Sequence, residues 1–295
     1  MNQSPLRILT VADTPCDPNS GAAGTVYYTN QAFRELGQEV DEIWADDLGA
    51  RCIHHGNLHS LLEQPRAYRH AVMKAVKKKN YDVIQMSQPQ AYLAAKALKQ
   101  SGFQGVVINR SHGVELRADN VLPYWYQKLG FRESRFPGFL TRSLRKLLQR
   151  QWYEVIKYCD AIIVTCQDDR DCLVKSLPIA PNKVSVIHHG VPRVFIHTPT
   201  KPYSPERQKR LLYVGQSAFF KAPIILSKII NQILQSYQDV TMTWVTPESY
   251  HSYVKSLLNP EILSRVIFLD WQPQDKLIAL YDSCGIFIFP SLVSS

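Results

Sequence analysis

The sequence lacks three features that would each indicate a different class of protein. Among its 295 residues no stretch approaches the ~18 apolar residues of a membrane-spanning helix, and the apolar run 6–12 is too short for a secretory signal. The six cysteines are scattered and form none of the C-x-x-C pairs of zinc or redox sites. We therefore expect a cytoplasmic protein with free thiols, no metal and no other bound cofactor.

Acidic residues are outnumbered by basic ones. The chain has 34 Lys and Arg against 25 Asp and Glu, which gives a formal net charge of +9 at pH 7. This excess suits phosphate-bearing ligands, nucleic acid or an anionic membrane surface, and a solvated basic face is the alternative to all three. Because the sequence contains no nucleic-acid recognition module, we rank nucleic acid last and expect no such partner.

Short apolar runs alternate with longer amphipathic runs, which predicts parallel sheets covered by helices. A proline-bearing polar stretch interrupts this alternation, and the alternation then restarts. We predict a Rossmann-like domain over residues 1–195, a linker over 196–210 and a second Rossmann-like domain over 211–295. Strands are expected at residues 6–12, 40–45, 82–87, 106–109, 161–165, 184–188, 211–214, 240–246, 266–270 and 286–289.

The last predicted strand, 286–289, is continuously apolar, as in a strand covered on both faces. The chain ends at Ser295, before a covering helix could follow. Buried apolar surface contributes roughly 25 cal/mol per Å², so a missing layer would cost several kcal/mol. We expect the second domain to be incomplete, truncated at its C-terminus. The alternative is that this strand simply ends a small domain.

Ligands bind open parallel sheets at the carboxyl ends of the strands, and the loops there hold suggestive residues. Gly21 and Gly24 follow the first strand, where glycines let a ligand approach the backbone and a helix N-terminus favours anions. The loop is not G-x-G-x-x-G, which disfavours a standard NAD site. An ordinary strand-to-helix turn is the alternative reading.

Two further loops carry histidines. His112 and Glu115 follow the strand 106–109, and a histidine there can hydrogen-bond a sugar hydroxyl or a developing charge. A structural hydrogen bond is the alternative. His189 and Gly190 follow the strand 184–188, where a hinge-loop role is the simpler interpretation and a metal pair is disfavoured.

Lys221 comes shortly after the strand 211–214 and the pair Gly215 and Gln216. A lysine at the start of a helix can bind a diphosphate. Lysine is otherwise electrostatically disfavoured at that end of a helix, which favours a functional role.

Taken together, these loops resemble glycosyltransferase family 4, whose GT-B fold has two facing Rossmann-like domains. The resemblance runs through nearly the whole chain. Its motifs are Gly21 with Gly24, residues 37–40, His112-Gly113-Val114-Glu115, residues 183–187 leading to Gly190, Leu212-Tyr213-Val214-Gly215 with Lys221, and Phe287-Ile288-Phe289-Pro290-Ser291.

The resemblance implies a retaining, metal-independent transfer of a sugar from a UDP- or GDP-linked donor to a glycan or lipid-linked acceptor, as in polysaccharide biosynthesis. The first domain would hold the acceptor and the second the donor. By this likeness His112 is the catalytic residue near the transferring sugar, and Glu115, His189 and Gly190 lie in the cleft. The implied donor-binding residues are Gly21, Gly24, Gly215, Gln216, Lys221 and Ser291.

Two departures from the family pattern leave an alternative open. Gln216 stands where the family usually has arginine, so one diphosphate cation is missing. The acidic motif that contacts the donor sugar would begin just past Ser295. The alternative is therefore a catalytically inactive truncated remnant, or a pseudoenzyme that binds nucleotide-sugars.

A basic stretch, Arg142, Arg145, Lys146 and Arg150, falls on a predicted helix that also bears Phe139 and several leucines. Such a helix could contact an anionic membrane peripherally, at its inner face, or face a lipid-linked acceptor. A solvated basic face over a core stripe is the alternative.

Overall fold

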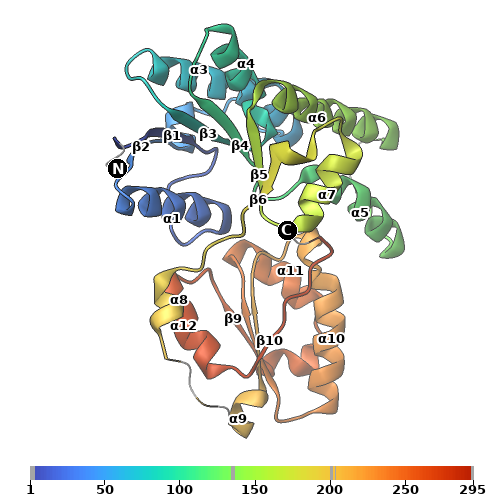
Figure 1. Ribbon diagram of the computed structural model, residues 1–295. Helices are drawn as coiled ribbons and strands as arrows, with labels where there is room; N and C mark the ends of the chain where they lie inside the picture. Colours follow the sequence, from blue (N-terminus) through green and yellow to red (C-terminus); the bar gives the residue numbers. More distant parts are fainter. Residues whose placement is uncertain (1–3, 134–136, 200–201, 203, 294–295) are drawn as a thin grey trace. The chain divides into compact units, whose positions relative to one another are not determined.

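The computed structural model describes residues 4–133, 137–199, 202 and 204–293. The chain divides into two compact units, of which the first runs to Gly190 and the second begins at Val191 (Figure 1). The division precedes the linker predicted from residue 196. The segment after it contains two short helices, α8 (Arg193–His197) and α9 (Pro205–Gln208), which belong to the second unit.

The first unit contains a parallel six-stranded sheet in the order β2-β1-β3-β4-β5-β6. The order reverses between β1 and β3, which creates the kind of switch point where such sheets bind ligands. All six strands expected in this half are confirmed, within a few residues at their ends. Their bounds are β1 Arg7–Val11, β2 Glu39–Ile43, β3 Val83–Ser87, β4 Val106–Arg110, β5 Ala161–Val164 and β6 Val184–Val186.

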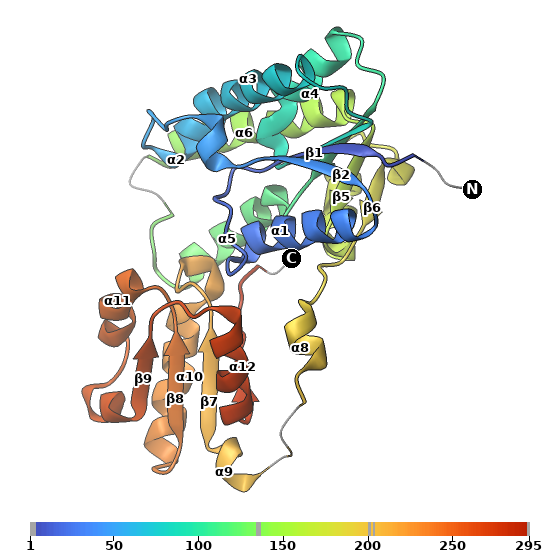
Figure 2. The same cartoon turned by 90° about the vertical axis from the view of Figure 1, so that its left-hand side faces the viewer.

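Helices cover both faces of this sheet. The alternation of side chains along β1 sends Leu9 and Val11 into the larger core, while Thr10 accepts a hydrogen bond from Asn30 of α1 on the other face. Figure 2 shows α3, α4 and α6 over one face and α1 over the other. The α-helices are α1 Gly21–Glu35, α2 Gly56–Leu58, α3 Gln64–Val76, α4 Tyr92–Gln100, α5 Glu115–Lys128, α6 Gly138–Tyr158 and α7 Gln167–Ser176.

The second unit contains a parallel four-stranded sheet in the order β10-β7-β8-β9. Along β7, Leu211 and Tyr213 pack with α10 in one core, and Leu212 packs on the other face beside α12. The four strands expected here are confirmed, with bounds β7 Arg210–Val214, β8 Thr241–Val245, β9 Val266–Leu269 and β10 Ile286–Phe287. The remaining helices are α10 Pro223–Ser236, α11 His251–Ser256 and α12 Gln274–Ser283.

Two local expectations are wrong. The first helix begins at Gly21, directly after its N-cap Ser20, so Gly21 and Gly24 lie in its first turns rather than in a loop. The last strand, expected over 286–289, is limited to Ile286–Phe287 and lies at the edge of the sheet, where Phe287 is 46% exposed.

None of the helices in the described ranges is both long enough and apolar enough to span a membrane.

Candidate functional site

The loops after β4 and β6 carry residues predicted near a transferring sugar. His112 follows β4, and its Nε2 lies 3.1 Å from the Oγ of Ser87 at the end of β3. Burial, together with the charges of Arg110 and His189, lowers the pKa of His112 to about 4. The imidazole is therefore neutral at pH 7 and offers a hydrogen bond rather than a charge. His189 and Gly190 are exposed in the loop after β6.

Glu115, the first residue of α5, has a carboxyl oxygen buried in the first unit. This atom, Oε2, has no hydrogen-bond partner among the described residues. Burial raises the pKa of Glu115 to about 7, and the carboxylates of Asp119 and Asp13 contribute to the rise. Burial also raises the pKa of Asp13 and that of Asp119. All three groups therefore retain protons more readily than exposed carboxylates do.

These three carboxyl groups line a cavity of about 480 Å³, which we call the acidic cavity. Its volume falls in the range of small-molecule sites, roughly 300–1,000 Å³. It lies at the switch point of the sheet, because Asp13 follows β1 and Gln90 follows β3. His112 is not among the described residues that line it. The other polar lining residues are Asn57, Ser60, Gln64, Gln88, Glu133, Thr141, Arg145, Gln149 and Gln151.

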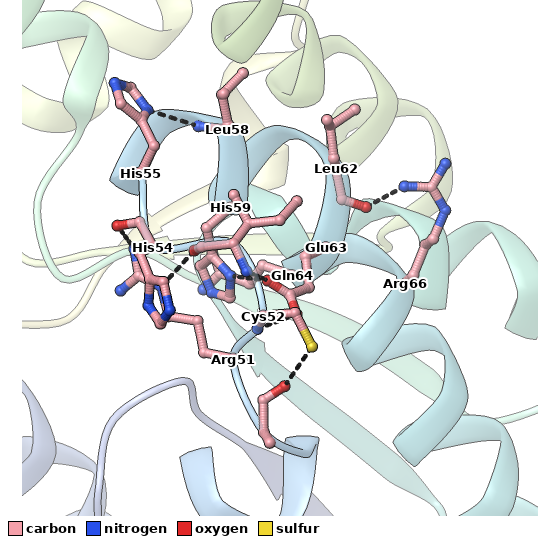
Figure 3. A network of polar contacts seen from close by, with 12 residues as sticks. Arg51, Cys52, His54, His55, Leu58, His59, Leu62, Glu63, Gln64 and Arg66 are labelled. Carbon is pink, nitrogen blue, oxygen red and sulfur yellow. Dashed lines mark hydrogen bonds and ion pairs between the residues drawn. The ribbon is translucent and has the colours of Figure 1, made fainter.

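A second cavity in the first unit, of about 620 Å³, also has Asp13 in its lining. Glu63 lies in this lining. Its carboxylate accepts hydrogen bonds from the backbone N–H of Cys52 at 2.7 Å and from that of Ile53 at 2.9 Å (Figure 3). The Nδ1 of His59 lies 2.8 Å from the same carboxylate. These contacts, with the Cys52 N–H first, lower the pKa of Glu63 to about 2. These hydrogen bonds connect the loop that contains Cys52 and Ile53 to the helical turn that contains Glu63, and this structural role accounts for them.

In the second unit, the structure brings together four of the predicted donor-binding residues at the carboxyl edge of the sheet. Gly215 and Gln216 directly follow β7, and β10 pairs alongside β7 shortly before Ser291. The Oγ of Ser291 donates a hydrogen bond to the carbonyl oxygen of Phe220 at 3.3 Å, beside Lys221. Residues far apart in the sequence therefore meet at one edge.

Lys221 lies at this edge between two aromatic rings. Its Nζ is 5.0 Å from the ring centre of Phe289 and 5.4 Å from that of Phe220. Burial lowers the pKa of Lys221, and no described acidic side chain offsets this effect. The next residue, Ala222, is the N-cap of α10 and has φ 54°. It therefore has the left-handed conformation, which is strained for a residue other than glycine. A partly desolvated ammonium group without a described counter-ion is suited to bind an anion.

The glycines of the predicted site meet different surroundings. A Cβ on Gly24 would lie 2.7 Å from the carbonyl oxygen of Pro18, so Gly24 permits a close approach of its own loop. A Cβ on Gly21 or Gly190 would meet nothing within 4 Å. A Cβ on Gly215 would lie 2.9 Å from the hydroxyl oxygen of Tyr213, which donates to the carbonyl oxygen of Gln216.

The basic residues of α6 do not form one surface. Arg142, Lys146 and Arg150 are exposed, and exposed apolar side chains, including Phe139 at 63%, lie on the same helix. Arg145 instead places its Nε 2.8 Å from Asp119 and pairs with Glu133. Arg145 is therefore removed from the predicted membrane-facing set, because Asp119 and Glu133 hold it at the acidic cavity.

A model of the family described as Glycosyltransferase Family 4 matches residues 19–195. The chain belongs to glycosyltransferase family 4. Among curated proteins, this family member is 25% identical over 167 residues to the D-inositol 3-phosphate glycosyltransferase of Corynebacterium diphtheriae. That match covers 50% of this chain and 38% of the relative, and the corresponding protein of Corynebacterium efficiens matches at 24% identity.

Solved structures show the fold of this family 4 protein. Sucrose-phosphate synthase from Thermosynechococcus elongatus matches with a TM-score of 0.70 at 16% identity, covering 98% of this chain and 76% of that one. Anabaena HepE, solved in complex with UDP and glucose, matches with a TM-score of 0.61 at 16% identity, covering 97% of this chain and 74% of that one. The predicted family and the GT-B fold, with its two α/β units, are confirmed.

Sequence reasoning missed most of the acidic cavity of this family 4 protein. Asp13 directly follows a predicted strand and could have been found from its position at a carboxyl edge. No sequence pattern identified Gln90, Gln149 and Gln151, because they line the cavity only through the packing of elements that are distant in the sequence. The roles assigned to His112, Lys221 and the other site residues remain predictions.

Proposed function

We propose that this protein transfers a sugar, with retention of configuration and without a metal ion, from a UDP- or GDP-linked donor to a glycan or lipid-linked acceptor. Family membership supports sugar transfer in general. Structural neighbours solved with UDP and glucose, with UDP-2-fluoro glucose, or with ADP support a nucleotide-linked donor. The observation that carries the proposal for this chain is Lys221, a cation without a described acidic partner at the carboxyl edge of the second sheet.

On the donor side, Lys221 would neutralise the diphosphate as it leaves. The positive N-terminal end of α10, which begins two residues later, would add to this attraction. Gly215 and Gln216 would lie against the nucleotide, and Ser291 would offer a hydroxyl close to the lysine. Stabilising a developing anion with preorganised charge is commonly a large contribution to catalysis, and here it would replace a metal ion.

On the acceptor side, His112 would act as a neutral hydrogen-bonding group. With its pKa lowered to about 4, it can orient a sugar hydroxyl or donate to a developing charge without carrying a charge of its own at pH 7. Its contact with Ser87 would hold the ring orientation. Glu115, His189 and Gly190 belong to the same unit and would shape the surrounding surface.

A second candidate is a protein that binds nucleotide-sugars without transferring them. Gln216 favours it, because that residue supplies no charge where family resemblance places an arginine. The two candidates share the donor site and differ in whether nucleoside diphosphate is released.

We also propose a peripheral contact with anionic lipid through Arg142, Lys146 and Arg150 of α6. Exposed Phe139 and Leu147 on this helix would insert among the headgroups while the cations bind them. Such a contact would bring the protein to a lipid-linked acceptor at the inner face of a membrane.

Calorimetric titration of the full chain with UDP-glucose, GDP-mannose and ADP-glucose tests the donor site. UDP-glucose or GDP-mannose should bind more tightly than ADP-glucose, and Lys221→Met should weaken binding roughly ten- to hundredfold, the equivalent of one charged hydrogen bond. Lys209→Met is the matched control, because Lys209 precedes β7 at the opposite edge of the sheet and pairs with Asp239. Equal affinities for both variants would refute the assignment of Lys221.

A further inference from the structure

Three side-chain amides that line the acidic cavity of the first unit already donate to oxygen atoms of the protein. The Nε2 of Gln151 donates to the carbonyl oxygen of Ser60 at 2.8 Å, and the Nε2 of Gln149 donates to Asp119 at 2.9 Å. Gln64 donates to Asp13 in the same way. Since each partner is a carbonyl or carboxylate oxygen, the NH₂ group must face it, which fixes the orientation of each amide.

The hydrogen-bond acceptors of the acidic cavity are in the opposite situation. Three buried oxygens on its lining residues have no partner among the described residues: Oε1 of Gln90, Oε2 of Glu115 and Oε1 of Gln151. Gln151 is only 3% exposed, so its free oxygen is deep in the unit. Buried oxygens of this kind need donors, because an unmade hydrogen bond leaves the cost of desolvating the oxygen uncompensated.

The positive charge in the lining of this cavity is already paired with carboxyl groups. Arg145 contributes a guanidinium group, but that group is bound to Asp119 and Glu133. Asp13 and Glu115 add further carboxyl groups to the lining. Burial is the main cause that raises the pKa values of Asp13, Glu115 and Asp119, so a negative charge in this cavity is poorly solvated. Another anion would be desolvated in the same way and would meet these carboxyl groups.

We infer that the acidic cavity binds the ring of the acceptor as an uncharged, hydroxyl-rich sugar and excludes phosphorylated sugars. That the bound sugar is the acceptor rests on the proposed function. That the cavity binds an uncharged sugar rests only on its lining residues. Sugar hydroxyls donate the hydrogens that the three free oxygens lack, and a phosphate group at neutral pH does not. The corynebacterial relatives are named for a phosphorylated acceptor, so this chain would differ from them in its acceptor.

The test is a binding comparison on the full chain by saturation-transfer NMR and calorimetry. The probes are glucose, mannose, galactose, N-acetylglucosamine and myo-inositol, each uncharged, with glucose 6-phosphate, mannose 6-phosphate, inositol 3-phosphate and glucosamine as charged counterparts. At least one uncharged ring should bind, and its phosphate should bind at least tenfold more weakly. Tighter binding of a phosphate or of the cationic glucosamine, or no binding of any uncharged probe, would overturn the inference.

Substitutions locate the effect in the cavity. Gln90→Arg adds a cation and donors, so it should reduce the discrimination against phosphate at least tenfold. Gln104→Arg is the control, because Gln104 is exposed and outside the cavity lining. Gln151→Met removes a free acceptor oxygen and should weaken the uncharged sugar. If Gln90→Arg and Gln104→Arg leave discrimination equally unchanged, the cavity is not the binding site.

Nucleotide-sugar titration of the same preparations separates this inference from the proposed function. If no nucleotide-sugar binds but the protein still prefers uncharged sugars to phosphorylated ones, the proposed donor site is refuted and the inference about the acidic cavity is supported. Intact nucleotide-sugar binding, with no dependence of sugar binding on Gln90 or Gln151, would refute the cavity and leave the donor site standing.

Discussion

Replacing Glu115 with glutamine should stabilise the first unit at high pH and leave it nearly unchanged at low pH. In the folded protein burial raises the pKa of Glu115 from its ordinary value of 4.5 to about 7. A group with a raised pKa contributes its full stability below pH 4.5, and that contribution is lost as the pH rises through about 7. Glutamine has the same shape as the protonated acid and does not titrate.

The magnitude follows from the two pKa values. The difference between 4.5 and about 7 corresponds to about 3 kcal/mol of unfolding free energy, all of it lost in the wild type by pH 8. Glu115→Gln should therefore exceed the wild type by about 2–3 kcal/mol at pH 8, allowing for relaxation around the charge. At pH 4.5–5 the two proteins should agree within about 0.5–1 kcal/mol.

Hydrogen exchange is the appropriate assay, because two units need not unfold as one transition. Exchange of the buried amides of β4 and β5, followed by mass spectrometry, reports the opening of the first unit, and each comparison is made at a single pH. Glu35→Gln is the control, because Glu35 is exposed on α1. Stabilisation of the same size at both pH values, or at neither, would show that the Glu115 carboxyl is not held as described.

Two further predictions test local packing and the lipid contact. Gly24→Ala should destabilise the protein by about 1–3 kcal/mol through overpacking against the carbonyl oxygen of Pro18, whereas Gly21→Ala should be neutral or slightly stabilising, and thermal denaturation compares the pair. Equal effects of the two substitutions would contradict the packing described for α1. Reversing the charges of Arg142, Lys146 and Arg150 to Glu should reduce sedimentation with phosphatidylserine vesicles roughly a hundredfold, at about 1 kcal/mol per residue. The same reversal of the exposed Lys74, Lys77 and Lys78 should have little effect, and equal losses would rule out α6 as the lipid-binding surface.

The strands were predictable because each is a short apolar run bounded by polar turns, and the alternation of strand and helix sufficed for the fold. The start of α1 was not, since Gly21, Ala22, Ala23 and Gly24 have the composition of a loop although they are helical in the structure. The length of the last strand was overestimated, because the apolar run extends over 286–289 whereas only Ile286 and Phe287 pair with β7.

The candidate site was predictable only where strand ends mark it. His112, Glu115, Gly215 and Lys221 follow strands directly or closely, so the rule that ligands bind at carboxyl edges selects them. The free oxygen of Gln151 depends on the distant carbonyl of Ser60, which no local pattern encodes.

Arg145 is equivalent to its basic neighbours in the sequence. It separates from them only because Asp119 and Glu133 lie beside it in the fold. The position of each of these side chains is determined by its partners on other elements, and the residue type alone does not reveal those partners.

The central proposal is that this chain transfers sugar with retention, and the fate of the donor's anomeric carbon tests this proposal most directly. Proton NMR of the full chain, incubated with a bound nucleotide-sugar and an uncharged acceptor sugar, follows both nucleoside diphosphate release and the anomeric signal of the product. We predict that diphosphate accumulates, that the first-formed product has the donor's anomeric configuration, and that Lys221→Met slows release. A bound donor that remains intact, or a product of inverted configuration, would contradict the account.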